Sequence, residues 1–305
     1  MNIPDYSDEQ FWNNIIDEYI KNRQKFVTWI DLEKHLWNYF KYCLQKGNRY
    51  YFQHPLLPLL ESELSKHVYI LRKNVEIYRA RNDENYRLWN EWLDYCKIES
   101  TPPTIKKIED RNVDEDIVNK LWRDYNTFVS SEHTQQIKKR VESGFQGFDA
   151  EESSAPPADM AIEGRCNLKG VSYLYAALEE HTAVAEIRPH IKDTISIATI
   201  KPICDLKLID FDYEPSKTVH GEDFLFNNIQ HEFSLIHKEQ SKDYLVTQYI
   251  TSLIEHLGYD GLCFRSSLVK DGTNYVIFKP DNCSIVSSDL CLLTEVKYNY
   301  GKCKK

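Results

Sequence analysis

The stretch VSYLYAALEEHTAVAEIRP, residues 171–189, decides how the second half of the chain is expected to fold. It begins with the alternation of a strand, which includes two tyrosines, and continues with the pattern of a helix. Because proline disfavours the helical conformation in the residue before it, this helix must end near Pro189. Ala183 and Ala185 would let the helix pack closely against a sheet. The segment therefore predicts a strand followed by a tightly packed helix that carries Glu186.

Strand-like patterns lie on both sides of this segment. Apolar and polar residues alternate, as they do in half-buried strands, over residues 75–81, 194–201, 206–212, 260–267 and 273–280. The last two runs predict a hairpin around the turn Lys270-Asp271-Gly272. One helix, at residues 243–257, is expected between these two pairs of strands. Antiparallel strands with few interspersed helices indicate an α+β domain instead of a doubly wound one.

The first 72 residues predict a small helical module. A capping-box pattern starts at Ser7 and opens a helix in which Phe11, Ile15, Ile16 and Tyr19 share one face. Two further helices are expected at residues 31–45 and 61–71. A second helical stretch, at about 84–144, and a loop rich in Gly, Ser and Pro, at 142–165, then precede the segment quoted above.

Charge and cysteine usage exclude several classes of protein. A net charge of −9 argues against a general binder of nucleic acids or anionic membranes. No apolar run approaches the roughly 20 residues of a membrane span, and the acidic, polar first residues do not resemble a signal peptide. The 8 cysteines form no CxxC pair and no metal-type spacing, so we expect reduced thiols, a cytoplasmic location and no metal site.

Common catalytic motifs are absent. The chain has no GxGxxG, P-loop or GxSxG pattern, and the spacing of His231 and His237 does not fit HExxH. Arg49 and His54 have the R-x4-H spacing found in HEPN-type ribonucleases. That signal is weak, because two residue types at loose spacing recur by chance. An aromatic-flanked surface pair is the alternative interpretation.

A more specific constellation extends from the strand at 75–81 through the second half of the chain. Its parts are VEIYRAR (75–81), GRCNLKGVSYLYAALEEHTAVAEIRP (164–189), KDYLVTQYI (242–250) and YDGLCFRSS with NYVIFKP (259–280). In type and order these motifs resemble the RES domain, a family named for its Arg, Glu and Ser. The resemblance covers about residues 74–285, interrupted by the long helical stretch at 84–144. The N-terminal helices look like the HEPN-like module that precedes some RES domains.

The resemblance implies a fold, an activity and partners. The fold would be a split antiparallel β-sandwich similar to that of ADP-ribosyltransferases, with residues 1–72 as the helical module, 73–290 as the RES domain and 291–305 as a tail. RES proteins are toxins that cleave the nicotinamide–ribose bond of NAD⁺ and are neutralised by an antitoxin with a helix-turn-helix. NAD⁺ is then the substrate and no cofactor is expected. The family resemblance also allows a homodimer.

Position in the motifs assigns the candidate site. The expected catalytic residues are Arg79, Tyr175, Glu186 and Ser267, and the expected ligand contacts also include Arg81, Arg165, Tyr173, Ser266 and Asn274. An arginine on an apolar strand face, such as Arg79, needs a partner, and the pyrophosphate of NAD⁺ would be one. A carboxylate such as that of Glu186 would stabilise the oxocarbenium-like state of glycosidic cleavage.

Several roles remain open at the level of sequence. Arg79 could instead pair with an internal carboxylate, and Arg165 could hold the ligand or anchor its loop. Tyr173 and Tyr175 share a strand face, so one would be a core residue and the other would face the ligand. Of Ser266 and Ser267, which face opposite ways, we favour Ser267 for the site. Asn274 and Gln248 could serve only as structural support.

The functions that follow differ mainly in the acceptor of ADP-ribose. Hydrolysis or phosphorolysis of NAD⁺ is the first prediction, and mono-ADP-ribosylation of a protein is its rival within the same chemistry. A different class would be a HEPN-like ribonuclease or RNA-binding module that carries an inactive RES domain. A protein that only senses NAD⁺ or ADP-ribose is a further possibility.

Overall fold

The structure is a computed structural model that describes residues 6–22, 30–47, 54–83, 143–212, 224–235 and 244–297, together with residues 123, 127 and 139. The chain divides into two compact units. The first combines Met1–Ile77, Ser154–Thr182 and Lys201–Ser284, and the second combines Tyr78–Ser153, Ala183–Ile200 and Ile285–Lys305. Most of the predicted helical stretch at 84–144 lies outside the described residues. Within them, no helix has the length and apolar character needed to cross a membrane.

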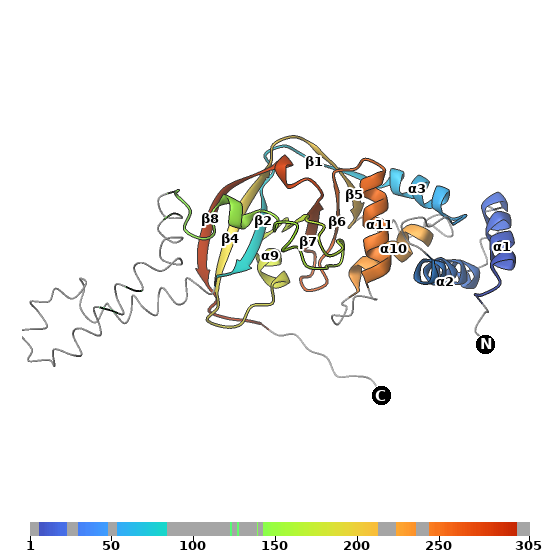
Figure 1. Ribbon diagram of the computed structural model, residues 1–305, viewed down its shortest axis with the longest axis horizontal. Coiled ribbons are helices and arrows are strands. Elements are labelled where there is room, and N and C mark those ends of the chain that lie inside the picture. Colours follow the sequence, from blue (N-terminus) through green and yellow to red (C-terminus); the bar gives the residue numbers. More distant parts are fainter. Residues whose placement is uncertain are drawn as a thin grey trace, which may run out of the picture. The chain divides into compact units, whose positions relative to one another are not determined.

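Five neighbouring strands of a mixed sheet form the centre of the first unit (Figure 1). Its strands, in spatial order, are β1 (Val68–Leu71), β5 (Leu206–Phe211), β6 (Gly261–Arg265), β7 (Thr273–Ile277) and β3 (Leu174–Ala177). Three of the four pairings are antiparallel, and β6 and β7 form the predicted hairpin, in which Asp271 has a φ of 61°. The α+β class is thus confirmed.

The pairing of β5 with β6 corrects the expectation of an all-antiparallel sheet. These strands run parallel, with Ile209 opposite Leu262. Parallel strands need a long crossover connection, which is usually helical. Here the crossover contains two helices, α10 (Phe224–Ser234) and α11 (Leu245–His256), of which the sequence patterns predicted only the second. Figure 1 shows both helices against the β5–β6 part of the sheet.

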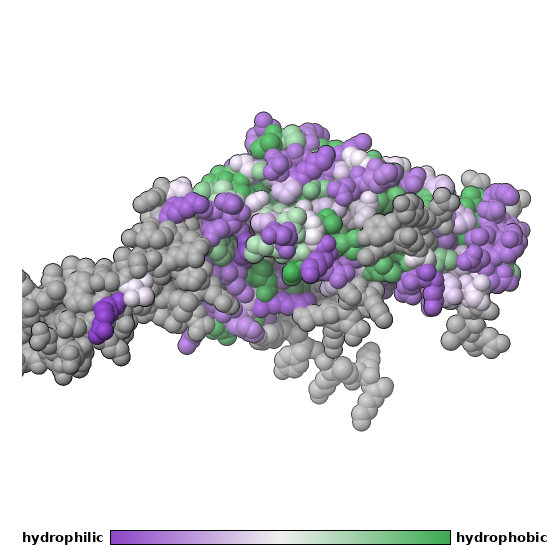
Figure 2. Space-filling view, in the orientation of Figure 1, coloured by the Kyte–Doolittle hydropathy of each residue, from purple (hydrophilic) through white to green (hydrophobic). Residues whose placement is uncertain are grey.

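The N-terminal helices share one hydrophobic core with α10, α11 and a face of this sheet. These helices are α1 (Glu9–Asn22), α2 (Ile30–Lys46) and α3 (Leu57–Lys66). The core contains Ile16, Tyr39, Phe40 and Leu60 from the N-terminal helices, Phe226, Phe233 and Ile250 from the crossover helices, and Ile209, Phe211, Leu262, Phe264 and Val276 from the strands. The solvent side of α1 is mostly hydrophilic (Figure 2). Burial of so many large apolar side chains stabilises the N-terminal helices against the rest of the unit.

Two details of the N-terminal helices differ from prediction. The carboxylate of Asp8 caps α1 by accepting the backbone N–H of Phe11 at 3.0 Å, and Trp12 joins the core while the Phe11 side chain is 51% exposed. Trp12 therefore takes the place of Phe11 on the buried face, while Ile16 and Tyr19 are buried as predicted. The third helix ends at Lys66, so its predicted extension to residue 71 is wrong. Residues 68–71 form strand β1 instead of the end of this helix. Its β-branched Val68, a residue type that favours strands, lies opposite Ile209 of β5.

The second unit contains three adjacent strands. They are β2 (Ile77–Asn82), β4 (Thr194–Pro202) and β8 (Cys283–Leu292), in this spatial order, and each extends one or two residues beyond the unit. The sequence predicted β2 and β4 but not β8, which includes the first residues of the expected C-terminal tail. A short helix, α8 (Ala150–Ser153), lies within the predicted loop at 142–165. Helix α9 (Glu180–Glu186) is the predicted helix before Pro189.

Candidate active site

Asn167 organises the loop at residues 163–167, which contains the GRCN motif. Its side-chain Nδ2 donates hydrogen bonds to the backbone carbonyls of Ile162 (2.8 Å), Val171 (3.0 Å) and Leu168 (3.1 Å). Its Oδ1 accepts the hydroxyl of Tyr175 at 2.7 Å. The buried Asn167 side chain therefore fixes the loop to the start of β3, and the sequence analysis had not assigned it a role.

Glycine is needed at position 164 because the loop passes very close to these groups. A Cβ at Gly164 would lie 2.6 Å from Oδ1 of Asn167 and 3.2 Å from the hydroxyl of Tyr175. That hydroxyl also accepts the backbone N–H of Cys166 at 3.1 Å. Burial raises the pKa of the Tyr175 hydroxyl well above its ordinary value, so it stays protonated and donates to Asn167.

Helix α11 holds the same loop from a second side. The hydroxyl of Thr247 donates to the backbone carbonyl of Arg165 at 2.6 Å. The Nε2 group of Gln248 donates to the carbonyls of Gly164 (2.9 Å) and Asn167 (3.2 Å). Both side chains are buried. The Thr-Gln pair of the KDYLVTQYI motif thus supports the loop, which is the structural alternative that the sequence left open for Gln248.

The side chain of Arg165 points to the end of α10. Its Nη1 and Nη2 atoms donate to the backbone carbonyls of Phe233 (2.6 Å) and Leu235 (3.1 Å). The guanidinium also lies 5.2 Å from the ring centroid of Phe264. Unpaired carbonyls at a helix C-terminus carry partial negative charge, so this is a favourable place for a cation. In the structure Arg165 is therefore an anchor for its loop.

The two tyrosines of the quoted segment have different surroundings. Tyr173 is only 4% exposed, its hydroxyl donates to Oε2 of Glu255 at 2.6 Å, and its ring centroid lies 4.9 Å from that of Phe278. Tyr175 is half-buried. Of the pair that the sequence could not separate, Tyr173 is the core residue and Tyr175 has the more accessible ring.

The two serines after β6 also differ. The buried hydroxyl of Ser266 accepts the backbone N–H groups of Leu268 (3.1 Å) and Val269 (3.2 Å), and therefore stabilises the turn between β6 and β7. Ser267 is half-exposed, and its hydroxyl makes no hydrogen bond to the part of the chain that the structure describes. The choice of Ser267 for the site stays a prediction. Asn274, on β7, is buried.

The turn at residues 266–272 packs against the first turn of α9. A Cβ at Gly272 would lie 2.6 Å from the hydroxyl of the buried Thr182, which itself donates to Oε2 of Glu179 at 2.9 Å. Absence of a side chain at position 272 thus permits close contact with the helix. The turn that carries Ser267 therefore contacts the start of α9, and Glu186 is the last residue of this helix.

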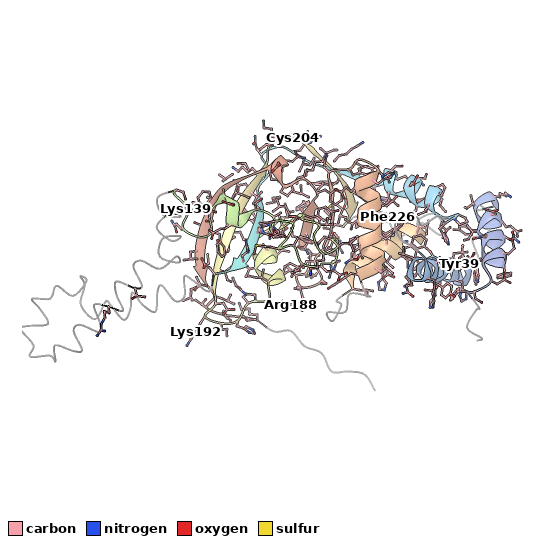
Figure 3. All side chains as sticks on the ribbon, viewed as in Figure 1. Tyr39, Lys139, Arg188, Lys192, Cys204 and Phe226 are labelled. Atoms are coloured by element: carbon pink, nitrogen blue, oxygen red, sulfur yellow. The ribbon has the colours of Figure 1, made fainter. Side chains whose placement is uncertain are left out.

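Glu186 is exposed at the end of α9. The helix closes immediately afterwards, because Arg188 adopts a φ of 48° and its N–H donates to the carbonyl of Ala185 at 3.0 Å (Figure 3). Ala183 is buried, as expected from close packing of this helix. The end predicted near Pro189 is confirmed, and the Glu186 carboxylate is presented to solvent.

The two arginines of β2 belong to the second unit, as Glu186 does. Arg79 is half-buried, and its Nε atom is shielded from solvent. Arg81 donates from Nη1 to the backbone carbonyl of Glu152, and its guanidinium lies 5.1 Å from the ring centroid of Phe148. Arg81 therefore fixes the segment around α8, and Arg79 remains the stronger candidate for a ligand contact.

His54, the histidine of the R-x4-H pattern, is a core residue. It is 6% exposed, and its ring centroid lies 5.3 Å from that of Tyr39 and 5.2 Å from that of Phe40. Its Nδ1 atom accepts the N–H of Leu56 at 3.2 Å. Burial lowers the pKa of His54 to about 4, so it is neutral at pH 7. The expectation of a surface pair is wrong for His54, and Arg49 lies outside the described residues.

Comparison with known proteins identifies the family. A family model described as the RES domain matches residues 115–294, more than half of the chain. The match contains Arg165, Tyr173, Tyr175, Glu186, Ser266, Ser267 and Asn274, whereas Arg79 and Arg81 precede it. No curated protein matches. A solved structure with some likeness is the crystal structure of the M. tuberculosis MbcT–MbcA toxin–antitoxin complex, with 12% identity over 46% of this chain and 76% of that chain and a TM-score of 0.30. From the extent of the family match, we conclude that the chain belongs to the RES domain family.

Proposed function

We propose that this RES-family protein is an NAD⁺-degrading, toxin-like enzyme that breaks the nicotinamide–ribose bond. The observation that carries the proposal is the family match, which contains Tyr175, Glu186 and Ser267 in the family's order. The structure supports it in one respect. Glu186 is exposed and Ser267 is half-exposed, so both could reach a substrate.

The proposed reaction needs charge stabilisation more than proton transfer. The C1–N bond between ribose and nicotinamide breaks, and nicotinamide leaves with both bonding electrons. Because the ring nitrogen of NAD⁺ is positively charged, nicotinamide leaves as a neutral molecule and needs no general acid. Positive charge develops on the ribose, where the carboxylate of Glu186 would stabilise it.

The remaining candidates would bind and orient NAD⁺. Arg79 would contact the pyrophosphate, because a guanidinium can form two parallel hydrogen bonds to a phosphate. The half-buried ring of Tyr175 would pack on the nicotinamide or the ribose. The hydroxyl of Ser267 would donate a hydrogen bond to the substrate. The acceptor that attacks C1 would be water or inorganic phosphate.

Incubation of the purified full chain with NAD⁺, with and without inorganic phosphate, tests this function. Release of nicotinamide with ADP-ribose indicates water as the acceptor, and ADP-ribose-1″-phosphate indicates phosphate. Label from adenine-labelled NAD⁺ that becomes attached to protein would indicate a protein acceptor instead. Absence of nicotinamide under every condition would contradict the proposed activity of the isolated protein.

The toxin role and an antitoxin partner follow from the family resemblance and are part of the same proposal. Expression of the protein in bacteria should stop growth and lower cellular NAD⁺, and Glu186→Gln should relieve both effects. A ribonuclease is the less favoured alternative, since the buried and neutral His54 cannot take part in phosphodiester cleavage at the surface.

A further inference from the structure

Helix α10 connects the N-terminal helices to the loop that carries Arg165. Glu232, near the C-terminal end of α10, is 7% exposed. Its Oε1 atom accepts hydrogen bonds from two residues of α2, the Nζ of Lys41 at 2.8 Å and the Nε1 of Trp37 at 3.2 Å. The next residue, Phe233, provides the carbonyl that Nη1 of Arg165 contacts. Two adjacent residues of α10 therefore make the two contacts: Glu232 bonds to α2, and Phe233 bonds to Arg165.

The connection to α2 is specific because a buried carboxylate is costly to leave without partners. Trp37 is buried and Lys41 is half-exposed, and both direct their donors to one oxygen of Glu232. If one donor is lost, the remaining charge is stabilised less well. The orientation of α10 relative to α2 is thus determined by directed hydrogen bonds as well as by apolar packing.

The aromatic rings around Phe233 connect the position of α10 to that of Arg165. The ring of Phe233 stacks on Phe211 with centroids 4.8 Å apart, and its centroid lies 5.6 Å from that of Phe264. Phe264 is also the ring beside the guanidinium of Arg165. A shift of α10 would therefore change both the carbonyls and the aromatic surface that hold Arg165.

We propose that Glu232 is a positioning residue for NAD⁺ cleavage. It fixes α10 to α2, and so it keeps the carbonyls of Phe233 and Leu235 where Arg165 and the 163–167 loop require them. This inference rests on the proposed function, because it assumes that the loop borders the NAD⁺ site. The N-terminal helices are then part of the scaffold of the active site and not a separate module.

The effect of losing Glu232 should be partial. Thr247 and Gln248 of α11 still hold the backbone of the loop, so the loop keeps one of its two supports. We expect Glu232→Leu to raise the KM for NAD⁺ by about threefold to thirtyfold with a smaller change in kcat. Glu232→Gln keeps an oxygen acceptor for α2 and should give a smaller increase. Amide hydrogen exchange of residues 161–170 should become faster than in the wild type in both variants, and more so in Glu232→Leu than in Glu232→Gln.

Ile16→Ala is the matched control. Ile16 is buried in α1, which packs on α2, and its truncation destabilises the same core from outside α10 and its hydrogen bonds to α2. This variant should lower the melting temperature at least as much as Glu232→Leu does, with an unchanged KM and unchanged exchange of residues 161–170. If Glu232→Leu does not fold, Lys41→Met removes the same ion pair from its half-exposed partner.

The outcomes separate this inference from the proposed function. A wild-type protein that releases nicotinamide, together with a Glu232→Leu variant of normal KM and normal exchange, would overturn the positioning role. An equal rise in KM in Ile16→Ala would overturn it too. If the wild type releases no nicotinamide, the proposed function fails and hydrogen exchange alone decides. Faster exchange of residues 161–170 in Glu232→Leu but not in Ile16→Ala would then support the part of the inference in which Glu232 positions the loop, and equal exchange would overturn it.

Discussion

The loop at 163–167 and the turn at 266–272 both carry residues of the RES motifs, but they use these residues differently. In the loop, the polar groups of Arg165 and Asn167 bond to neighbouring protein groups. In the turn, Ser266 bonds inward, whereas the hydroxyl of Ser267 has no partner among the described residues. Recurrence in a motif therefore does not by itself distinguish a scaffold residue from one that contacts a ligand.

The comparison gives a physical criterion for that distinction. A buried polar group must be hydrogen-bonded, so its removal should affect stability first. A polar group that faces solvent adds little to stability, so its removal should affect activity alone. By this criterion Asn167, Thr247, Gln248 and Ser266 are scaffold residues, whereas Glu186 and Ser267 stay the candidates for contact with a substrate.

Glu186→Gln should have the largest effect on catalysis. Loss of the negative charge beside a developing oxocarbenium should lower kcat by about 10²- to 10³-fold, while the melting temperature stays near that of the wild type because Glu186 is exposed. Nicotinamide release and a thermal melt check the two parts. Glu180→Gln, an exposed glutamate in the first turn of the same helix, is the control and should keep full activity. Equal activity of the two variants would remove Glu186 from the site.

Asn167→Ala should have the largest effect on stability. It removes the side-chain donor to three backbone carbonyls and the acceptor of the Tyr175 hydroxyl, which should lower the free energy of unfolding by about 2–4 kcal/mol. Tyr175→Phe removes only the hydroxyl and should cost about 1 kcal/mol. Urea unfolding at neutral pH measures both. A smaller loss for Asn167→Ala than for Tyr175→Phe would show that Asn167 does not organise the loop.

The neighbouring serines sharpen the comparison within one turn. Ser266→Ala should lower the free energy of unfolding by about 1–2 kcal/mol, because two backbone N–H groups lose their acceptor. Ser267→Ala should leave stability within about 0.5 kcal/mol of the wild type. It should lower kcat/KM for NAD⁺ by about tenfold, the value of one hydrogen bond to the substrate. Each serine is the control for the other, and reversed results would assign the substrate contact to Ser266.

Local sequence patterns predicted the strands and helices around the candidate site well. Period-two alternation identified β2, β4, β5 and the β6–β7 hairpin, and the proline at 189 indicated where α9 ends. Such signals work because they depend on neighbours in the chain. The parallel pairing of β5 with β6 has no local signal, since it depends on where the crossover returns the chain.

The roles of individual polar residues were harder to predict, because they depend on partners distant in sequence. Arg165 could equally bind a ligand or anchor its loop until the carbonyls of Phe233 and Leu235 were seen beside it, about 70 positions away in the chain. For Asn167 the sequence offers one indication of a structural role, which is its position in the GRCN motif, after a glycine and before the quoted segment. Glu232 gave none, since its partners lie in α2.

His54 applies the same criterion to a titratable group. Its pKa in the folded protein is about 4, below the ordinary value of 6.5, so the folded state binds its proton less well than the unfolded state does. The stability that this gives is present above pH 6.5 and is lost as the pH falls toward 4, by up to about 3 kcal/mol. His54→Asn keeps an acceptor for the N–H of Leu56 but does not titrate. Urea unfolding at pH 7, 6, 5 and 4.5 should show the stability difference between wild type and variant shrinking as the pH falls. Parallel curves would mean that His54 is accessible to protons in the folded protein, and the R-x4-H pattern would again need a functional explanation.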